Sequence, residues 1–142
     1  MRKILLSLII ILVTSVAFAG EFIRDYAADT VTDSTNSLMW QDNAVVASAT
    51  YTWTEAIDYC ENLDFAGQTD WQLPTINELR SIVDYDAYNL AIVSLFLNAA
   101  TSLYWSSTTS ATNTSSAWSI HFNYGGGYGS SKTSNNYVRC VR

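Results

Sequence analysis

Residues 70–85 read DWQLPTINELRSIVDY, and this stretch decides how the rest of the chain is expected to fold. Pro74 is the only proline in the sequence. Its ring fixes its own φ and biases Leu73 toward an extended conformation, so the chain turns here in a defined direction. Thr75 and Glu78 then form a Thr-x-x-Glu capping box, which predicts the start of a helix. The segment before the helix is expected to form an apolar knot of Trp71, Leu73 and Pro74.

This helix should bury one face and end near residues 84–88. Apolar side chains recur at helical spacing, at Ile76, Leu79, Ile82 and Val83. A second capping box, Thr52 with Glu55, predicts an earlier helix. Its apolar face would carry Trp53, Ala56, Ile57, Cys60 and Leu63. Its other face carries Asp58, Glu61 and Asn62, for which a solvated acidic surface is the favoured interpretation.

The rest of the first half is expected to contain extended segments and loops. Residues 22–40 are predicted to be extended around a polar turn at residues 33–37, whose short polar side chains favour turns. Residues 41–51 are predicted to be a loop. Residues 89–100 fit either a short helix or a packed loop.

Short aromatic strands are predicted in the second half. Residues 103–108 are rich in aromatic and β-branched side chains, which favour a strand. Residues 117–122 alternate, which predicts a half-buried strand with Trp118, Ile120 and Phe122 inward and Ser119 and His121 outward. Residues 124–129, YGGGYG, are predicted to be a turn or loop. A final strand over residues 137–142 would point Val138 and Cys140 inward and Tyr137 and Arg139 outward.

Helices followed by strands indicate an α+β fold with an antiparallel sheet. The sequence has no internal repeat and no linker that would divide residues 20–142, so we expect one domain there. Residues 1–19 have the pattern of a secretory signal peptide: Arg2 and Lys3, an apolar run, and Ala17-Phe18-Ala19. The alternative is an uncleaved anchor, but the apolar run is short for a membrane span. We therefore expect a secreted, periplasmic or cell-surface protein with no membrane insertion after signal cleavage.

The charge balance limits the partners. Removing Arg2 and Lys3 leaves 5 of the 7 basic residues and all 13 acidic ones, a formal charge of −8. Such an acidic chain argues against binding nucleic acid or anionic membranes, and it does not favour sulfated polysaccharides.

Cys60 and Cys140 are the only cysteines. In an oxidising compartment the favoured interpretation is one structural disulfide. A catalytic thiol or half of a metal site are the alternatives, and both need nearby partners. The only histidine is His121, so a zinc site would lack ligands. No metal and no cofactor is predicted.

Five motifs occur in order, at residues 52–60, 70–79, 104–108, 117–118 and 138–142. Together they resemble the Lcl C-terminal domain, the C-terminal domain of bacterial collagen-like adhesins, long described as a domain of unknown function. The resemblance covers about residues 30–142. It implies a C-type-lectin-like fold, related to the formylglycine-generating enzymes, with two helices flanking a small twisted antiparallel sheet. It also implies a bond from the first helix to the last strand, matching Cys60 and Cys140. The family usually has Arg where this chain has Gln72, so any ion pair of that arginine is absent here.

The activities of these fold relatives do not carry over. Calcium-dependent lectins need Glu-Pro-Asn or Gln-Pro-Asp together with Trp-Asn-Asp, because calcium takes six or more oxygen ligands. The sole proline lies in Leu-Pro-Thr, so no calcium-dependent sugar site is predicted. The formylglycine-generating enzymes need reactive cysteines, and both cysteines here are assigned to a bridge. His121 stands alone and no nucleophile elbow or phosphate loop occurs, so we expect no enzyme.

Residues 104–137 are crowded with Ser, Thr, Asn, Gly and Tyr, a composition typical of antibody paratopes. We expect a binding surface with Trp105 and Trp118 packed beneath it, formed by His121, Asn123, Tyr124, Tyr128, Asn135, Asn136 and Tyr137. Its ligand would be a glycan or an extracellular protein, which makes the chain an adhesin-like recognition module. One alternative is a structural periplasmic domain or a subunit of a surface assembly, in which the glycine-rich hairpin needs no ligand. A further alternative is that the segment is diversified among copies, as in variable-protein relatives of this fold.

Overall fold

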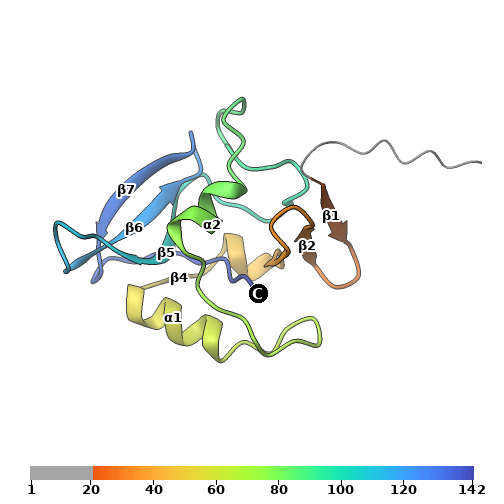
Figure 1. Ribbon diagram of the computed structural model, residues 1–142, viewed down its shortest axis with the longest axis horizontal. Coiled ribbons are helices and arrows are strands. Elements are labelled where there is room, and N and C mark those ends of the chain that lie inside the picture. Colours follow the sequence, from red (N-terminus) through yellow and green to blue (C-terminus); the bar gives the residue numbers. More distant parts are fainter. Residues whose placement is uncertain (1–20) are drawn as a thin grey trace, which may run out of the picture.

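The computed structural model describes residues 21–142, and the expected signal peptide lies outside the described residues. The strands form two sheets (Figure 1). The first contains β1 (Phe22–Asp25), β2 (Thr30–Asp33) and β3 (Leu38–Gln41). The second has the order β4-β8-β5-β6-β7 and is covered by the helices α1 (Trp53–Glu61) and α2 (Ile76–Ser81). The predicted mixed α+β class with antiparallel sheets is confirmed. The expected single sheet is two sheets, and the pair β5–β8 is parallel.

Both predicted capping boxes are confirmed. The Glu55 carboxylate accepts hydrogen bonds from the Thr52 backbone N–H at 2.9 Å and from the Thr52 hydroxyl at 2.7 Å. At α2, Glu78 accepts from the Thr75 N–H at 2.7 Å, and the Thr75 hydroxyl accepts from the Glu78 N–H at 3.2 Å. These bonds satisfy backbone donors that a helix start leaves free, so each helix begins where the sequence predicted.

Helix α2 is shorter than expected: it ends at Ser81, not near residues 84–88. Ile82 caps it, and the Ile82 carbonyl accepts from the Val93 N–H at 3.0 Å. A carbonyl that bonds a distant segment is not available for a further helical turn. The chain beyond Ile82 therefore leaves the helix, although Ile82 and Val83 remain buried as the periodicity indicated.

The first sheet is a three-stranded antiparallel meander. Its second turn lies in the predicted polar stretch, where the Asp33 carboxylate accepts the N–H groups of Thr35 and Asn36. The predicted loop over residues 41–51 contains two short elements: a 3₁₀ helix, η1 (Ala44–Ala47), and the strand β4 (Thr50–Tyr51). Residues 89–100 form a packed loop without helix or strand, which settles the ambiguity between the two.

The second sheet is built on β5 (Leu103–Thr109), β6 (Ser116–His121) and β7 (Gly126–Ser131), with β8 (Asn136–Tyr137) beside β5. The glycine-rich stretch expected to be a turn is mostly strand β7, and the tight turn is only residues 122–125. All six residues of β7 pair with β6, and this pairing holds the glycines in a strand. The prediction that Ser119 on β6 faces outward was also wrong, because Ser119 is completely buried.

The core has two parts, on opposite faces of the second sheet. On one face, α2 and Ile120 share a cluster with residues of the first sheet. On the other, α1 packs with Trp105 around the Cys60–Cys140 disulfide, whose Cα atoms lie 5.5 Å apart. Trp71 and Leu73 belong to this second cluster, and Pro74 is also buried, as the predicted apolar knot requires. The predicted disulfide is therefore confirmed, and it joins α1 to the extended segment after β8.

The C-terminal segment differs from the predicted strand in one important side chain. Arg139 was expected to point outward, but it is fully buried. Its guanidinium bonds the Asp42 carboxylate at 2.6 Å, the Gln41 carbonyl at 2.7 Å and the Asn98 carbonyl at 2.6 Å. The outer side of this segment is covered by the first sheet and the loop at residues 95–98, so alternation does not separate core from solvent here.

Candidate functional site: a tyrosine surface

Three aromatic rings gather at the turn between β6 and β7, and we call His121, Tyr124 and Tyr128 the ring cluster. The His121 and Tyr124 rings are stacked, with centroids 5.1 Å apart and planes 18° apart. Tyr128 meets Tyr124 edge-on at 6.2 Å, and the two hydroxyls share a short hydrogen bond. The His121 Nδ1 accepts the Asn123 backbone N–H at 3.3 Å. Each ring is thus oriented by its neighbours.

The strand pairing explains why these rings meet. His121 is opposite Gly126 and Ser119 is opposite Tyr128, and paired residues point to the same face of a sheet. Tyr124 folds back over the strand, where a Cβ added to Gly126 would lie 2.8 Å from its ring and 3.4 Å from the Tyr128 ring. Glycine at position 126 therefore provides the space in which the two tyrosines lie.

A second segment, residues 84–90, brings two further exposed tyrosines to the ring cluster. The Asn89 N–H donates to the Asn123 carbonyl at 2.9 Å, which ties this loop to the β6–β7 turn. A Cβ added to Gly125 would lie 3.4 Å from the Tyr85 ring. Tyr85 and Tyr88 are 68% and 72% exposed. We call the ring cluster together with Tyr85 and Tyr88 the tyrosine surface.

Tyr85 and Tyr88 were not predicted as surface residues, because residues 84–88 were assigned to the end of a helix. The available signal was the composition of this segment, DYDAY, which alternates turn-forming aspartates with exposed aromatics. The backbone is unusual just after it: Asn89 and Leu90 have φ values of 60° and 152°. A positive φ is rare for leucine, and no sequence pattern predicts it.

The structure brings together only part of the predicted binding set. His121, Asn123, Tyr124 and Tyr128 lie together. Asn136 is buried and donates to the Ser119 hydroxyl at 3.3 Å, and Tyr137 stacks on Tyr104 in the core. Asn135 is exposed in the connection between β7 and β8.

The two tryptophans expected beneath the surface lie on different faces of the sheet. Trp105 pairs with Ser119, so it shares the face of the ring cluster, and its Nε1 donates to the Tyr51 carbonyl at 2.8 Å. Trp118 is half-buried and packs against the other core cluster, on the side of α2. The sheet itself therefore separates Trp118 from the ring cluster.

The hydroxyl contact changes the acidity of the surface. Sharing a hydrogen bond with Tyr128 raises the pKa of the Tyr124 phenol, and the nearby Tyr88 phenol raises this pKa further. The Tyr124 hydroxyl is therefore a neutral hydrogen-bonding group at physiological pH. The surface offers aromatic faces, neutral hydroxyls and the backbone of a glycine-rich strand.

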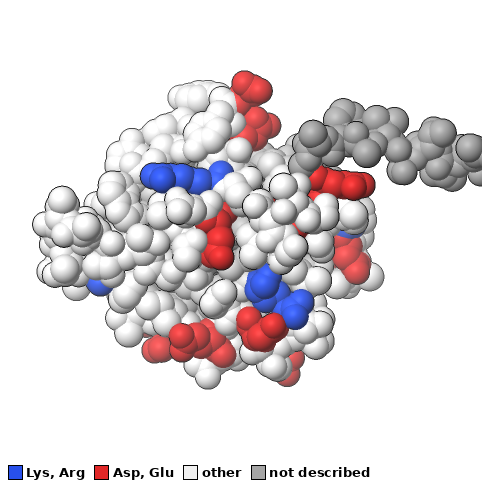
Figure 2. Space-filling view, viewed as in Figure 1, with Lys and Arg blue, Asp and Glu red and all other residues white. Residues whose placement is uncertain are grey.

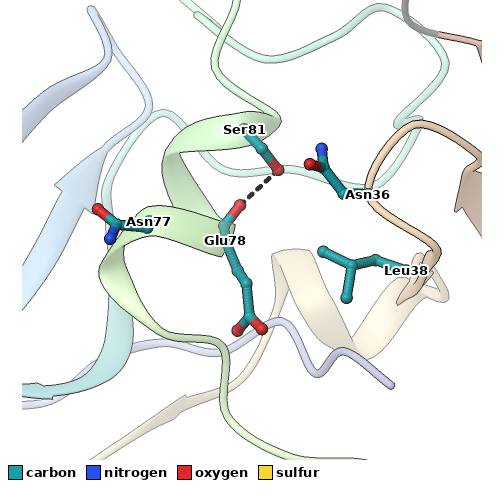
Figure 3. Close-up of a pocket in the computed structure, with 5 residues that line it drawn as sticks. All are labelled: Asn36, Leu38, Asn77, Glu78 and Ser81. Carbon is teal, nitrogen blue, oxygen red and sulfur yellow. Dashed lines mark hydrogen bonds between the residues drawn. The ribbon is translucent and has the colours of Figure 1, made fainter.

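One pocket, of about 250 Å³, lies away from these rings, between α2 and the turn that joins β2 to β3 (Figure 3). Its lining is Asn36, Leu38, Asn77, Glu78 and Ser81. Most of its polar groups have internal partners: Asn36 bonds Asp33, the Ser81 hydroxyl donates to the Glu78 carbonyl, and the Glu78 carboxylate caps α2. Few groups remain to hold a ligand there.

Neither a metal-binding group nor a membrane-spanning helix is found in residues 21–142. Within this range no group of three or more His, Cys, Asp or Glu side chains is placed to hold a metal ion. None of the helices described is long and apolar enough to cross a membrane.

The sequence profile of the Lcl C-terminal domain matches residues 29–142, which contain both helices, the disulfide and every described strand except β1. No curated protein matches the sequence. Because the profile covers most of the chain, this protein belongs to the Lcl C-terminal domain family.

Proposed function

We propose that this protein is an exported, non-enzymatic recognition module that binds a glycan or a protein at or outside the cell envelope, without calcium. The observation that carries this proposal is the tyrosine surface. Two segments distant in sequence, residues 84–90 and the β6–β7 hairpin, carry four exposed tyrosines and are joined by the hydrogen bond between Asn89 and Asn123. A packed protein has no structural need to expose so many aromatic rings in one place.

The surface suits recognition because its rings are held before a ligand arrives. Tyrosine offers a large apolar face and a polar hydroxyl, which suits stacking on sugar rings or packing on a protein. The stacked and edge-on contacts within the ring cluster already restrict its side chains. Binding would then lose little side-chain entropy.

Three observations support an extracytoplasmic, surface-associated role. The family is that of the Lcl C-terminal domain, the disulfide is of a kind that persists in oxidising compartments, and residues 1–19 have a signal-peptide pattern. We also propose that the described residues form one C-type-lectin-like domain, since the disulfide from α1 to the C-terminal segment fits that fold.

A structural role is the second candidate, and one contact favours it. The Tyr124 and Tyr128 hydroxyls satisfy each other, so the ring cluster does not require a ligand. In that case the protein would be a periplasmic domain or a subunit of a surface assembly, and the rings would only stabilise the hairpin.

The test is a binding screen of the oxidised protein against glycan arrays and extracellular-matrix proteins, with and without a calcium chelator. Tyr124→Ala and Tyr128→Ala should abolish binding and keep the melting temperature. Tyr26→Ala is the matched control, because Tyr26 is 72% exposed at the turn between β1 and β2. Binding that requires calcium would contradict the proposed mode, and a screen without any ligand would favour the structural role.

A further inference from the structure

Exposed aromatic area is concentrated on the tyrosine surface. Eight large hydrophobic side chains are exposed in residues 21–142, and half of them are the four tyrosines of this surface. Such a concentration marks an interaction site more strongly than scattered exposed residues do. The chemistry around the rings then indicates what kind of partner fits.

Two carboxylates lie beside Tyr85 in the loop after α2. Asp84 and Asp86 stand on either side of Tyr85, and Asp86 is exposed. The Asp84 carboxylate accepts the Asp86 backbone N–H at 3.0 Å, which fixes the turn that presents both side chains. In Figure 2 acidic groups lie on the projecting loop after α2, which Figure 1 shows beside the end of the β6–β7 hairpin.

The positive charges of the described residues are mostly engaged elsewhere. Four of the five have partners away from the rings: Arg24 and Arg139 at Asp42, Arg142 at Asp70, and Lys132 over the Trp53 ring. Arg80 lies near β7 but on its other face: its guanidinium would be 3.3 Å from a Cβ added to Gly127, which pairs with Ile120 on the side of α2. The two segments that carry the tyrosine surface, residues 84–90 and 121–128, contain two carboxylates and no Lys or Arg, within an acidic chain.

We propose that the tyrosine surface binds a cationic segment of a partner protein, whose lysine or arginine side chains lie on the tyrosine rings and pair with Asp84 and Asp86. This inference rests on the proposed recognition function and names its partner class. Ammonium and guanidinium groups are attracted to the faces of aromatic rings, and the adjacent carboxylates add charge complementarity. A neutral glycan can stack on the same rings, but the net negative charge adds no long-range attraction for it.

The test is a titration of the oxidised protein, by calorimetry at physiological salt, with three probes. These are a decapeptide of alternating arginine and glycine, the same peptide with glutamate in place of arginine, and cellohexaose. We expect the arginine peptide alone to bind. The double variant Asp84→Asn/Asp86→Asn should weaken it at least tenfold, and so should Tyr85→Ala/Tyr88→Ala.

The matched control is Asp58→Asn/Glu61→Gln, which removes the same charge from the exposed face of α1. It should leave the affinity within twofold. If this control weakens binding as much as Asp84→Asn/Asp86→Asn does, the affinity for the peptide depends only on the net charge of the protein, and the inference fails.

Two other outcomes overturn the inference and leave the recognition function standing. One is binding of cellohexaose or of the glutamate peptide in preference to the arginine peptide. The other is no binding of the arginine peptide, while the broader screen still finds a ligand that depends on Tyr124 and Tyr128. The recognition function itself fails only if that screen finds no such ligand.

Discussion

Arg139 and Asp42 form an ion pair in which both side chains are completely buried, with the guanidinium Nη1 2.6 Å from the carboxylate. Arg24 pairs with the other oxygen of the same carboxylate. The backbone N–H groups of Leu97 and Asn98 also donate to Asp42, at 2.8 and 3.3 Å. One carboxylate thus connects the first sheet, the packed loop and the C-terminal segment. Burial lowers the pKa of Arg139, and the negative charge of Asp42 opposes this shift.

Replacing Asp42 by asparagine should strongly destabilise the fold, because the fully buried Arg139 would then lose its counter-charge and Arg24 would keep only Asp29, whose side chain is 50% exposed. We expect a loss of about 3–5 kcal/mol in the free energy of unfolding, the usual cost of breaking a buried pair from one side. Urea unfolding of the oxidised protein measures it.

The control is Asp70→Asn, which breaks the pair between Asp70 and Arg142, where the carboxylate is 63% exposed. Solvent screens such a pair, so its loss should change stability far less. Equal destabilisation by the two substitutions would show that Asp42 does not organise the core.

Local features were predictable from sequence and long-range ones were not. Capping boxes, composition and alternation are patterns of a few neighbouring residues, and they predicted both helices, β5 and β6. The disulfide was predictable over a long range only because Cys60 and Cys140 are the only cysteines. Arg139 was misplaced because its partner Asp42 lies 97 residues away. Residues 124–129 looked like a turn or loop because only the pairing with β6 makes the glycines from residue 126 onward part of a strand.

Only the hairpin half of the tyrosine surface was predictable, for the same reason. His121, Tyr124 and Tyr128 belong to one hairpin, so composition and alternation identified them together. Tyr85 and Tyr88 reach them through a hydrogen bond between Asn89 and Asn123, a contact that no local pattern encodes. Asn136 and Tyr137 fit the composition equally well, but β8 lies inside the sheet, where Asn136 is buried and Tyr137 is half-buried against Tyr104.

Removing the disulfide should destabilise the protein by about 3–5 kcal/mol, since it closes a loop of 80 residues and restricts the unfolded chain. The double variant Cys60→Ala/Cys140→Ala tests this by urea unfolding. The oxidised protein treated with reductant should fall to the stability of the double variant. A difference between these two forms would mean that the alanines disturb the core in which both cysteines are buried.

Stability should fall at alkaline pH because of Tyr104. Its hydroxyl accepts the Ala100 N–H at 2.8 Å and donates to the Val46 carbonyl at 2.9 Å, and burial raises its pKa above the ordinary value of 10.0. The unfolded chain therefore loses this proton before the folded chain does. The stability contributed by the neutral phenol is complete below pH 10 and is lost as pH rises toward the folded-state pKa.

Tyr104→Phe is the matched variant for this pH dependence. It should lower stability at pH 7 by about 1–3 kcal/mol, because a buried N–H and a carbonyl lose their partner. The variant should also lose stability less steeply than the original protein as pH rises above 10. Some decline will remain, since burial raises the pKa of Tyr59 as well. Unfolding curves at pH 7, 9 and 10.5 measure both effects, and an unchanged alkaline slope would remove Tyr104 as the cause.

Gly125 should be the residue on which the tyrosine surface most depends. Its φ is +77°, and a Cβ there would overlap the Val83 side chain and touch the Tyr85 ring. Gly67 has a similar φ of +71°, but a Cβ there would have no neighbour within 4 Å. Both Gly→Ala variants bear the left-handed backbone cost of about 1–2 kcal/mol. Only Gly125→Ala adds overpacking, about 1–3 kcal/mol more.

The difference in unfolding free energy between the two alanine variants therefore isolates the contact of the β6–β7 turn with the loop after α2. Relief of that overlap has to move the turn away from Val83, which separates Tyr124 from Tyr85 and Tyr88. Gly125→Ala should accordingly weaken ligand binding under conditions in which it remains folded, whereas Gly67→Ala should not. Equal stability of the two variants would mean that Val83 can move aside, and the two halves of the surface would then be independent.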